Sequence, residues 1–164
     1  MTESFHFDDL EFFTAGTLGP PGERTFFLQG RSRGETVSLK LEKQQVATLA
    51  DYLEQVLAEL PNQDAGQPPH DLTLREPVVP AWTVGAMGVA YDAAAGTVIV
   101  IAEPIGSDEV DDTEPPQARF ALRREQVTAL IDRVRDVVAA GREPCPLCGS
   151  PLQPRNGGWC ACSN

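Results

Sequence analysis

The chain has 164 residues, yet it contains only two histidines, and its first 144 residues contain no cysteine. No apolar run approaches the roughly 18 residues that a membrane-spanning helix needs. The first residues, MTESFHFDDL, have neither the basic start nor the apolar stretch of a secretory signal. These absences predict a cytoplasmic protein without a membrane segment. Because cytoplasmic thiols stay reduced, clustered cysteines are expected to bind a metal rather than to form disulfides.

Basic residues are also scarce. The chain has 13 Lys and Arg against 24 Asp and Glu, which gives a formal net charge of -11. Such a chain repels nucleic-acid phosphates and anionic membranes at long range. The charge therefore disfavours general nucleic-acid binding and membrane association, and it favours a protein partner.

The motifs of common enzymes are missing. The sequence has no G-x-S-x-G, H-E-x-x-H, Rossmann G-x-G-x-x-G or phosphate-binding P-loop. His6 alternates with Phe5 and Phe7, which predicts a strand that places His6 on the face opposite the two phenylalanines. His70 lies in a proline-rich connector and is expected to be exposed. The sequence therefore names no catalytic residue.

The clearest organisation is an internal similarity at an offset of 81. Residues 37–58 read VSLKLEKQQVATLADYLEQVLA, and residues 118–139 read ARFALRREQVTALIDRVRDVVA. In both copies the apolar residues recur with the spacing of one face of an amphipathic helix. The identical pairs are Leu41/Leu122, Gln45/Gln126, Val46/Val127, Leu49/Leu130, Asp51/Asp132, Val56/Val137 and Ala58/Ala139.

A second match lies upstream at an offset of 69, where FTAGTLG (13–19) resembles WTVGAMG (82–88). Glycines inside strands usually mark a bulge or a close backbone approach. Each match is followed by a β-rich run, RTFFLQG in the first half and TVIVIAE in the second, and then by a third expected strand near 36–42 or 117–123. Each half thus reads strand, strand, strand, helix.

These patterns predict an α+β body, residues 1–141, made of two βββα repeats related by a pseudo-two-fold axis. Repeat one covers about 1–60 and repeat two about 81–141. The alternative is chance similarity between two amphipathic helices. The proline-rich segment 61–80 is expected to connect the repeats, and the acidic insertion 103–116 is expected to form a solvated loop.

The last 20 residues, CPLCGSPLQPRNGGWCACSN, contain all four cysteines. Cys145 and Cys148 form a C-x2-C pair that can reach one metal from a tight turn, and Cys160 and Cys162 supply a second pair. Four thiolates predict a tetrahedral, structural Zn²⁺ site with no open ligand position, and so a zinc ribbon over 142–164. Iron and a disulfide pairing are the alternatives.

Three stretches together resemble a conserved, mainly actinobacterial family of unknown function: SFHFDDLEFFTAGTLGPPGERTFFLQ, VSLKLEKQQVATLADYLEQVL and the terminal CPLCGSPL. The resemblance implies a small cytoplasmic protein with no established activity. In that family the tail continues as G-H-x-C-P, whereas the matching stretch here is Gly157-Gly158-Trp159-Cys160-Ala161, which lacks the histidine. An exchange from this histidine to Cys162 would keep four ligands. If Cys162 does not reach the metal, three thiolates and an open position remain.

The sequence therefore favours a non-enzymatic binding or adaptor protein with a structural zinc ribbon and a protein partner. The alternative is an enzyme or a small-ligand-binding protein whose site lies at the junction of the two repeats. The partner, the substrate and the oligomeric state have no signature in the sequence.

Overall fold

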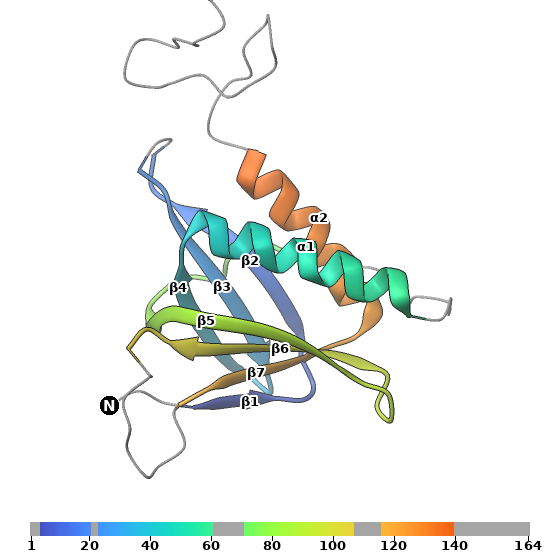
Figure 1. Ribbon diagram of the computed structural model, residues 1–164. Coiled ribbons are helices and arrows are strands. Elements are labelled where there is room, and N and C mark those ends of the chain that lie inside the picture. The colour runs from blue at the N-terminus through green and yellow to red at the C-terminus, as the bar shows by residue number, and fades with distance from the viewer. Residues whose placement is uncertain (1–3, 21–22, 61–70, 107–115, 140–164) are drawn as a thin grey trace, which may run out of the picture.

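The computed structural model describes residues 4–20, 23–60, 71–106 and 116–139. These residues form seven strands and two helices (Figure 1). The elements are β1 (Phe5–Phe7), β2 (Phe12–Leu18), β3 (Thr25–Ser32), β4 (Glu35–Leu41), α1 (Lys43–Glu59), β5 (Pro80–Asp92), β6 (Thr97–Pro104), β7 (Ala118–Leu122) and α2 (Arg124–Ala139).

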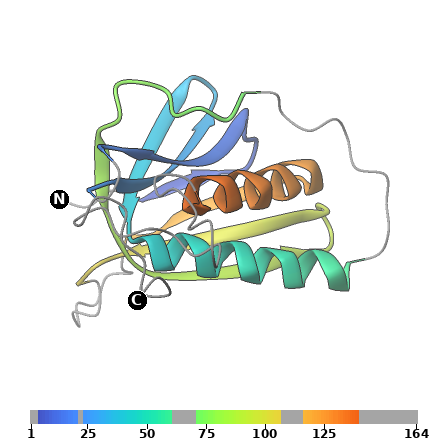
Figure 2. The ribbon, with the colours of Figure 1, turned by 90° about the horizontal axis from the view of Figure 1, so that it is seen from above.

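All seven strands belong to one sheet, in the order β1-β7-β6-β5-β4-β3-β2. Seen from above, the two helices lie side by side over β5 and β6, and the blue strands of the first half lie to one side of them (Figure 2). The predicted α+β class is confirmed. The first half has four strands rather than three, because residues 8–11 separate β1 from β2. None of the described helices is long and apolar enough to cross a bilayer.

Both helices form where the sequence predicts them, because their apolar residues repeat at helical spacing and face the core. The buried apolar residues are Val46, Leu49, Ala50 and Leu53 in α1, and Val127, Ala129, Leu130, Val134 and Val137 in α2. The two helices also begin alike. The Gln45 Oε1 accepts the Glu42 N–H at 2.7 Å, and the Gln126 Oε1 accepts the Arg123 N–H at 2.9 Å. Each glutamine thus satisfies a backbone donor that the first helical turn leaves unpaired.

The hydrophobic core is formed by residues from both halves of the chain. Phe120 on β7 is 1% exposed, and its ring centroid lies 4.7 Å from that of Phe13 and 5.7 Å from that of Phe7. A Cβ on Gly30 would stand 2.9 Å from the Phe120 ring. The glycine therefore makes room for an aromatic ring from the other half, and both halves share one packed interior.

Strand pairing also connects the halves. β2, β3 and β4 form an antiparallel group, as do β5, β6 and β7. β1 pairs in parallel with β7 of the second half, and the beginning of β5 pairs in parallel with β4 of the first half. Each half therefore places one strand segment beside the antiparallel group of the other half: β1 lies beside β7, and the beginning of β5 lies beside β4.

The ladder registers show which strand residues occupy equivalent places in the two groups. Thr17 pairs with Phe26, which pairs with Leu41, whereas Tyr91 pairs with Val98, which pairs with Leu122. Because Leu41 and Leu122 are the matched residues of the third strands, Thr17 corresponds to Tyr91, a separation of 74. The offset of 69 that the glycine pattern suggested is wrong by five residues.

The expected irregularity is found at Gly85. The register of β5 shifts between Val84 and Ala86, and a Cβ on Gly85 would lie 2.9 Å from the Ile105 Cα. The absence of a side chain lets the backbone of residue 105 approach the bulge, as the sequence pattern predicted for a strand glycine. Gly16, by contrast, lies in a regular part of β2.

Residues 71–79, here called the strap, cover the face of β2, β3 and β4 that points away from the helices. Figure 2 shows this green segment running along the outside of the blue strands. The Gln29 side chain donates to the Arg75 carbonyl at 2.9 Å and accepts the Arg75 N–H at 2.7 Å. A Cβ on Gly16 would collide with Leu74. This part of the connector is therefore held against the sheet.

A short polar cluster fixes the start of the strap. The Arg75 guanidinium donates to the Asp71 carboxylate at 2.9 Å, and the Thr73 N–H donates to the same side chain at 3.0 Å. These two bonds lower the pKa of Asp71 to about 2. The carboxylate therefore stays ionised, and its bonds to the strap persist, down to strongly acidic pH.

Candidate functional site

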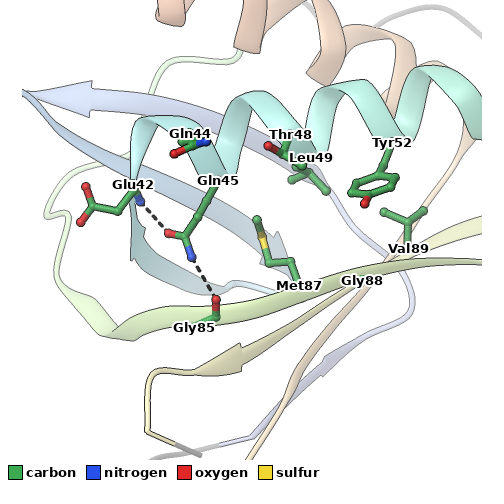
Figure 3. Close-up of a pocket in the computed structure, with 10 residues that line it drawn as sticks. All are labelled: Glu42, Gln44, Gln45, Thr48, Leu49, Tyr52, Gly85, Met87, Gly88 and Val89. Carbon is green, nitrogen blue, oxygen red and sulfur yellow. Dashed lines mark hydrogen bonds between the residues drawn. The ribbon is translucent and has the colours of Figure 1, made fainter.

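A cavity of about 460 Å³ lies between α1 and β5 (Figure 3). α1 follows β4, the last strand of the first half, and β5 is the first strand of the second half. The cavity is therefore at the junction of the two halves, where the sequence placed the alternative, ligand-binding site. Its volume lies within the usual range of small-molecule pockets, about 300–1,000 Å³.

Apolar side chains form most of the groove. Met87 and Val89 alternate along β5 and point toward α1, where Leu49 and Tyr52 face them (Figure 3). The Tyr52 side chain is one of the large exposed apolar groups of the molecule, at 56%. Met87 and Val89 are partly buried and pack against the core. They therefore form a floor of the groove that is held in place by the core and still partly exposed.

A neutral amide closes one end of the groove. The Gln45 Nε2 donates to the Val84 carbonyl at 3.1 Å and to the Gly85 carbonyl at 3.0 Å. Its Oε1 already accepts the Glu42 N–H, so the amide is engaged on both sides. Glu42 is the only charged residue among those that line the groove. The site thus offers shape and apolar surface, and no cationic group for an anion.

The equivalent place in the second half, between α2 and β2, is filled. The Gln126 Nε2 donates to the Leu10 carbonyl at 2.9 Å, as Gln45 does to Val84. Leu10 lies just before β2, as Val84 lies just before the bulge of β5. Below this bond the Phe13 ring is buried at 1% exposure, and the Arg133 Nε donates to the Ala15 carbonyl at 3.0 Å.

Two substitutions therefore distinguish the open groove from its filled counterpart. Met87 stands where the other half has Phe13, and Tyr52 stands where it has Arg133. A thioether chain occupies less of the space than a phenyl ring. Tyr52 carries no guanidinium that could cross to the strand. The groove therefore results from Met87 and Tyr52 rather than from the fold, because the other half has the same fold with Phe13 and Arg133 at these positions and its equivalent space is packed.

The four cysteines predicted to bind zinc, Cys145, Cys148, Cys160 and Cys162, all lie outside the described residues, as does His70. Within residues 4–20, 23–60, 71–106 and 116–139, no group of three or more His, Cys, Asp or Glu side chains could hold a metal ion.

His6 lies on the surface, as the alternation predicted. Its side chain is 61% exposed and its Nε2 lies 2.9 Å from the Asp8 carboxylate. The sequence pattern missed the groove residues because the wrong strand offset paired Met87 with Leu18 rather than with Phe13. With the correct offset, the exchange of phenylalanine for methionine is a visible signal.

The chain belongs to a family of proteins of unknown function, DUF3090, whose model matches residues 5–160. No curated protein and no solved structure matches it.

Proposed function

We propose that the protein is a non-catalytic binding protein that holds a small, uncharged and largely apolar ligand in the groove between α1 and β5. The observation that supports this most directly is the contrast between the halves. The space under α2 is filled by Phe13 and Arg133, whereas the space under α1 stays open above Met87 and Val89. An open apolar groove costs packing energy, so a bound ligand would restore contacts that the other half makes internally.

The lining sets the ligand class. Apart from Glu42 at the rim, its polar groups are neutral, and the Gln45 amide is committed to the backbone of β5 and to the start of α1. No pair of titratable groups converges on the groove to exchange a proton with a substrate. This supports retention of a ligand by burial of apolar surface rather than chemistry on it.

The groove can be tested by converting it into its filled counterpart. We expect the double variant Met87→Phe, Tyr52→Arg to bind the neutral fluorescent probe N-phenyl-1-naphthylamine at least about tenfold more weakly than the parent, because the added ring and guanidinium occupy the site. Fluorescence titration measures the affinity. Tyr91→Arg is the matched control, since Tyr91 is also exposed but lies outside the lining. Equal affinity in the double variant and the parent would contradict the proposed site.

We also propose that the two halves are an internal duplication with a pseudo-two-fold relation, each a βββα unit. Three correspondences support it: the order of elements, the crossed parallel pairs β1–β7 and β5–β4, and the glutamines at the helix starts. Gln45 and Gln126, separated by 81, each donate to a backbone carbonyl of the opposite half, Val84 in β5 and Leu10 just before β2. Chance similarity between two helices does not account for matched bonds on different elements.

For the tail we propose a structural zinc site formed by Cys145, Cys148, Cys160 and Cys162, in a lobe separate from the groove. Elemental analysis of purified protein should give one zinc per chain, and Cys148→Ser should remove it, because three remaining thiolates bind zinc less tightly. Ser150→Ala, in the same stretch, is the control and should keep the metal. A Cys162→Ser variant that retains one zinc per chain would contradict the four-thiolate site.

A further inference from the structure

One large face of the sheet is open among the described residues. On β5, residues 86, 88 and 90 lie on the side of the strand away from the helices, and all three are exposed. Their partners on β6 include Ile99 and Ile101, which are both partly exposed. A Cβ on Gly88 would meet nothing within 4 Å. This outer face of the second half, defined by Ala86, Gly88, Ala90, Ile99 and Ile101, is apolar up to the exposed Arg119 opposite Ile101 on β7, and no described segment covers it.

The corresponding face of the first half is covered. The strand registers match Ala86, Gly88, Ile99 and Ile101 with the buried side chains Phe12, Thr14, Phe27 and Gln29. All four are at most 6% exposed, because the strap lies over them. The same architectural surface is therefore buried in one half and open in the other.

The position of the strap in the chain points to what covers the open face. The strap begins 12 residues after the end of α1 at Glu59 and then crosses the outer face of the half that α1 belongs to. α2 ends at Ala139, and residues 140–164 follow it. An extended chain covers about 3.3 Å per residue, so the 25 residues that follow α2 are enough to cross the outer face of the second half.

We propose that residues 140–164 dock on the outer face of β5, β6 and β7, with the loop between Cys148 and Cys160 against the face whose counterpart in the first half the strap covers. The contact would be apolar. Where Gln29 bonds to the strap backbone, the second half has Ile101, and where Thr14 bonds to Leu72, it has Gly88. Leu152 and Trp159 are the large apolar side chains of the docking segment. The groove under α1 lies on the opposite side of β5 and plays no part in the docking.

The four isoleucines of the chain allow a direct test on the full-length protein. Ile99 and Ile101 lie on the proposed surface, Ile131 lies on α2, and Ile105 is 70% exposed beyond β6. In isoleucine-methyl NMR spectra, we expect nuclear Overhauser contacts from the methyl groups of residues 99 and 101 to protons of Leu152 or Trp159. A soluble paramagnetic agent should broaden these two methyl signals less than that of Ile105.

Two outcomes would overturn the proposal. The first is the absence of such contacts together with broadening of the Ile101 signal as strong as that of Ile105. The second is that the contacts appear between chains in a mixed sample of labelled and unlabelled protein, which would make a second copy the occupant.

A substitution provides an independent measurement. Ile101→Glu would place a carboxylate in the apolar contact, so trypsin should cleave after Arg155 about tenfold faster than in the parent. Ile105→Glu, which makes the same change outside the surface, should leave the cleavage rate unchanged. Unfolding midpoints of both variants show whether the sheet remains intact. Equal cleavage rates in Ile101→Glu and the parent would contradict docking on this face.

Discussion

Replacing Phe120 with alanine is expected to lower the free energy of unfolding by about 3–5 kcal/mol, the usual cost of removing a fully buried phenylalanine ring. The ring lies at the centre of the shared core, against Phe7 and Phe13 of the other half. Gly30 leaves no side chain that could move into the space. The cavity would therefore stay largely open. Urea unfolding followed by far-ultraviolet circular dichroism measures the loss.

Phe5→Ala is the matched control for this experiment. Phe5 is partly buried at the start of β1, and its ring contacts Phe7 at the edge of the core, 6.4 Å between centroids. Its loss should cost less, about 1–2 kcal/mol, because the ring is only partly buried and lies at the edge of the core. Equal losses from the two variants would mean that the halves do not share the core around Phe120.

Replacing Gln126 with leucine is expected to cost about 2–4 kcal/mol, because it removes two hydrogen bonds of a buried amide. The Arg123 N–H loses its acceptor, and the buried Leu10 carbonyl keeps only the 3.4 Å bond from the Arg123 guanidinium. Gln126 is 2% exposed, so water cannot replace these bonds without opening the structure. The side-chain volume is nearly kept, so the loss reports the hydrogen bonds rather than a cavity.

Gln45→Leu is the internal comparison for this second variant. Gln45 makes the equivalent bonds, but it does so at the end of an open groove where water can reach the freed carbonyls. Its loss should therefore cost about 1 kcal/mol. Chemical denaturation of both variants gives the difference. If Gln45→Leu costs as much as Gln126→Leu, the groove end is as closed as the filled site, which would contradict its openness.

Local patterns predicted the helices well and strand pairing poorly. The buried face of each helix follows from residues three and four apart, such as Val46 and Leu49, so one stretch of sequence contains the whole signal. The pairing of β1 with β7 joins distant residues and has no local signature. The offset between first strands also failed, because it rested on the spacing of glycines, and Gly88 pairs with Ile101 whereas neither Gly16 nor Gly19 has the equivalent place in the ladder of the first half.

The groove could not be found from residue types alone. A methionine and a tyrosine indicate a site only when they are compared with the phenylalanine and arginine at equivalent positions, and that comparison needs the strand register. The position of the strap on the sheet could not be predicted from the sequence for a similar reason. Its proline and turn-forming residues are typical of a loose connector, whereas the residues that hold it, Thr14 and Gln29, lie on strands far away in the sequence.

The crossed pairing of the first strands has a consequence for how the protein is made. During translation β1 leaves the ribosome early, but its neighbour in the sheet, beginning at Ala118, is synthesised more than a hundred residues later. Until then, the nascent chain exposes the edges of β1 and β4, which can pair with other strands and aggregate. Folding to completion must therefore wait for the last strand, and an amino-terminal fragment produced by premature termination should depend on chaperones or be degraded.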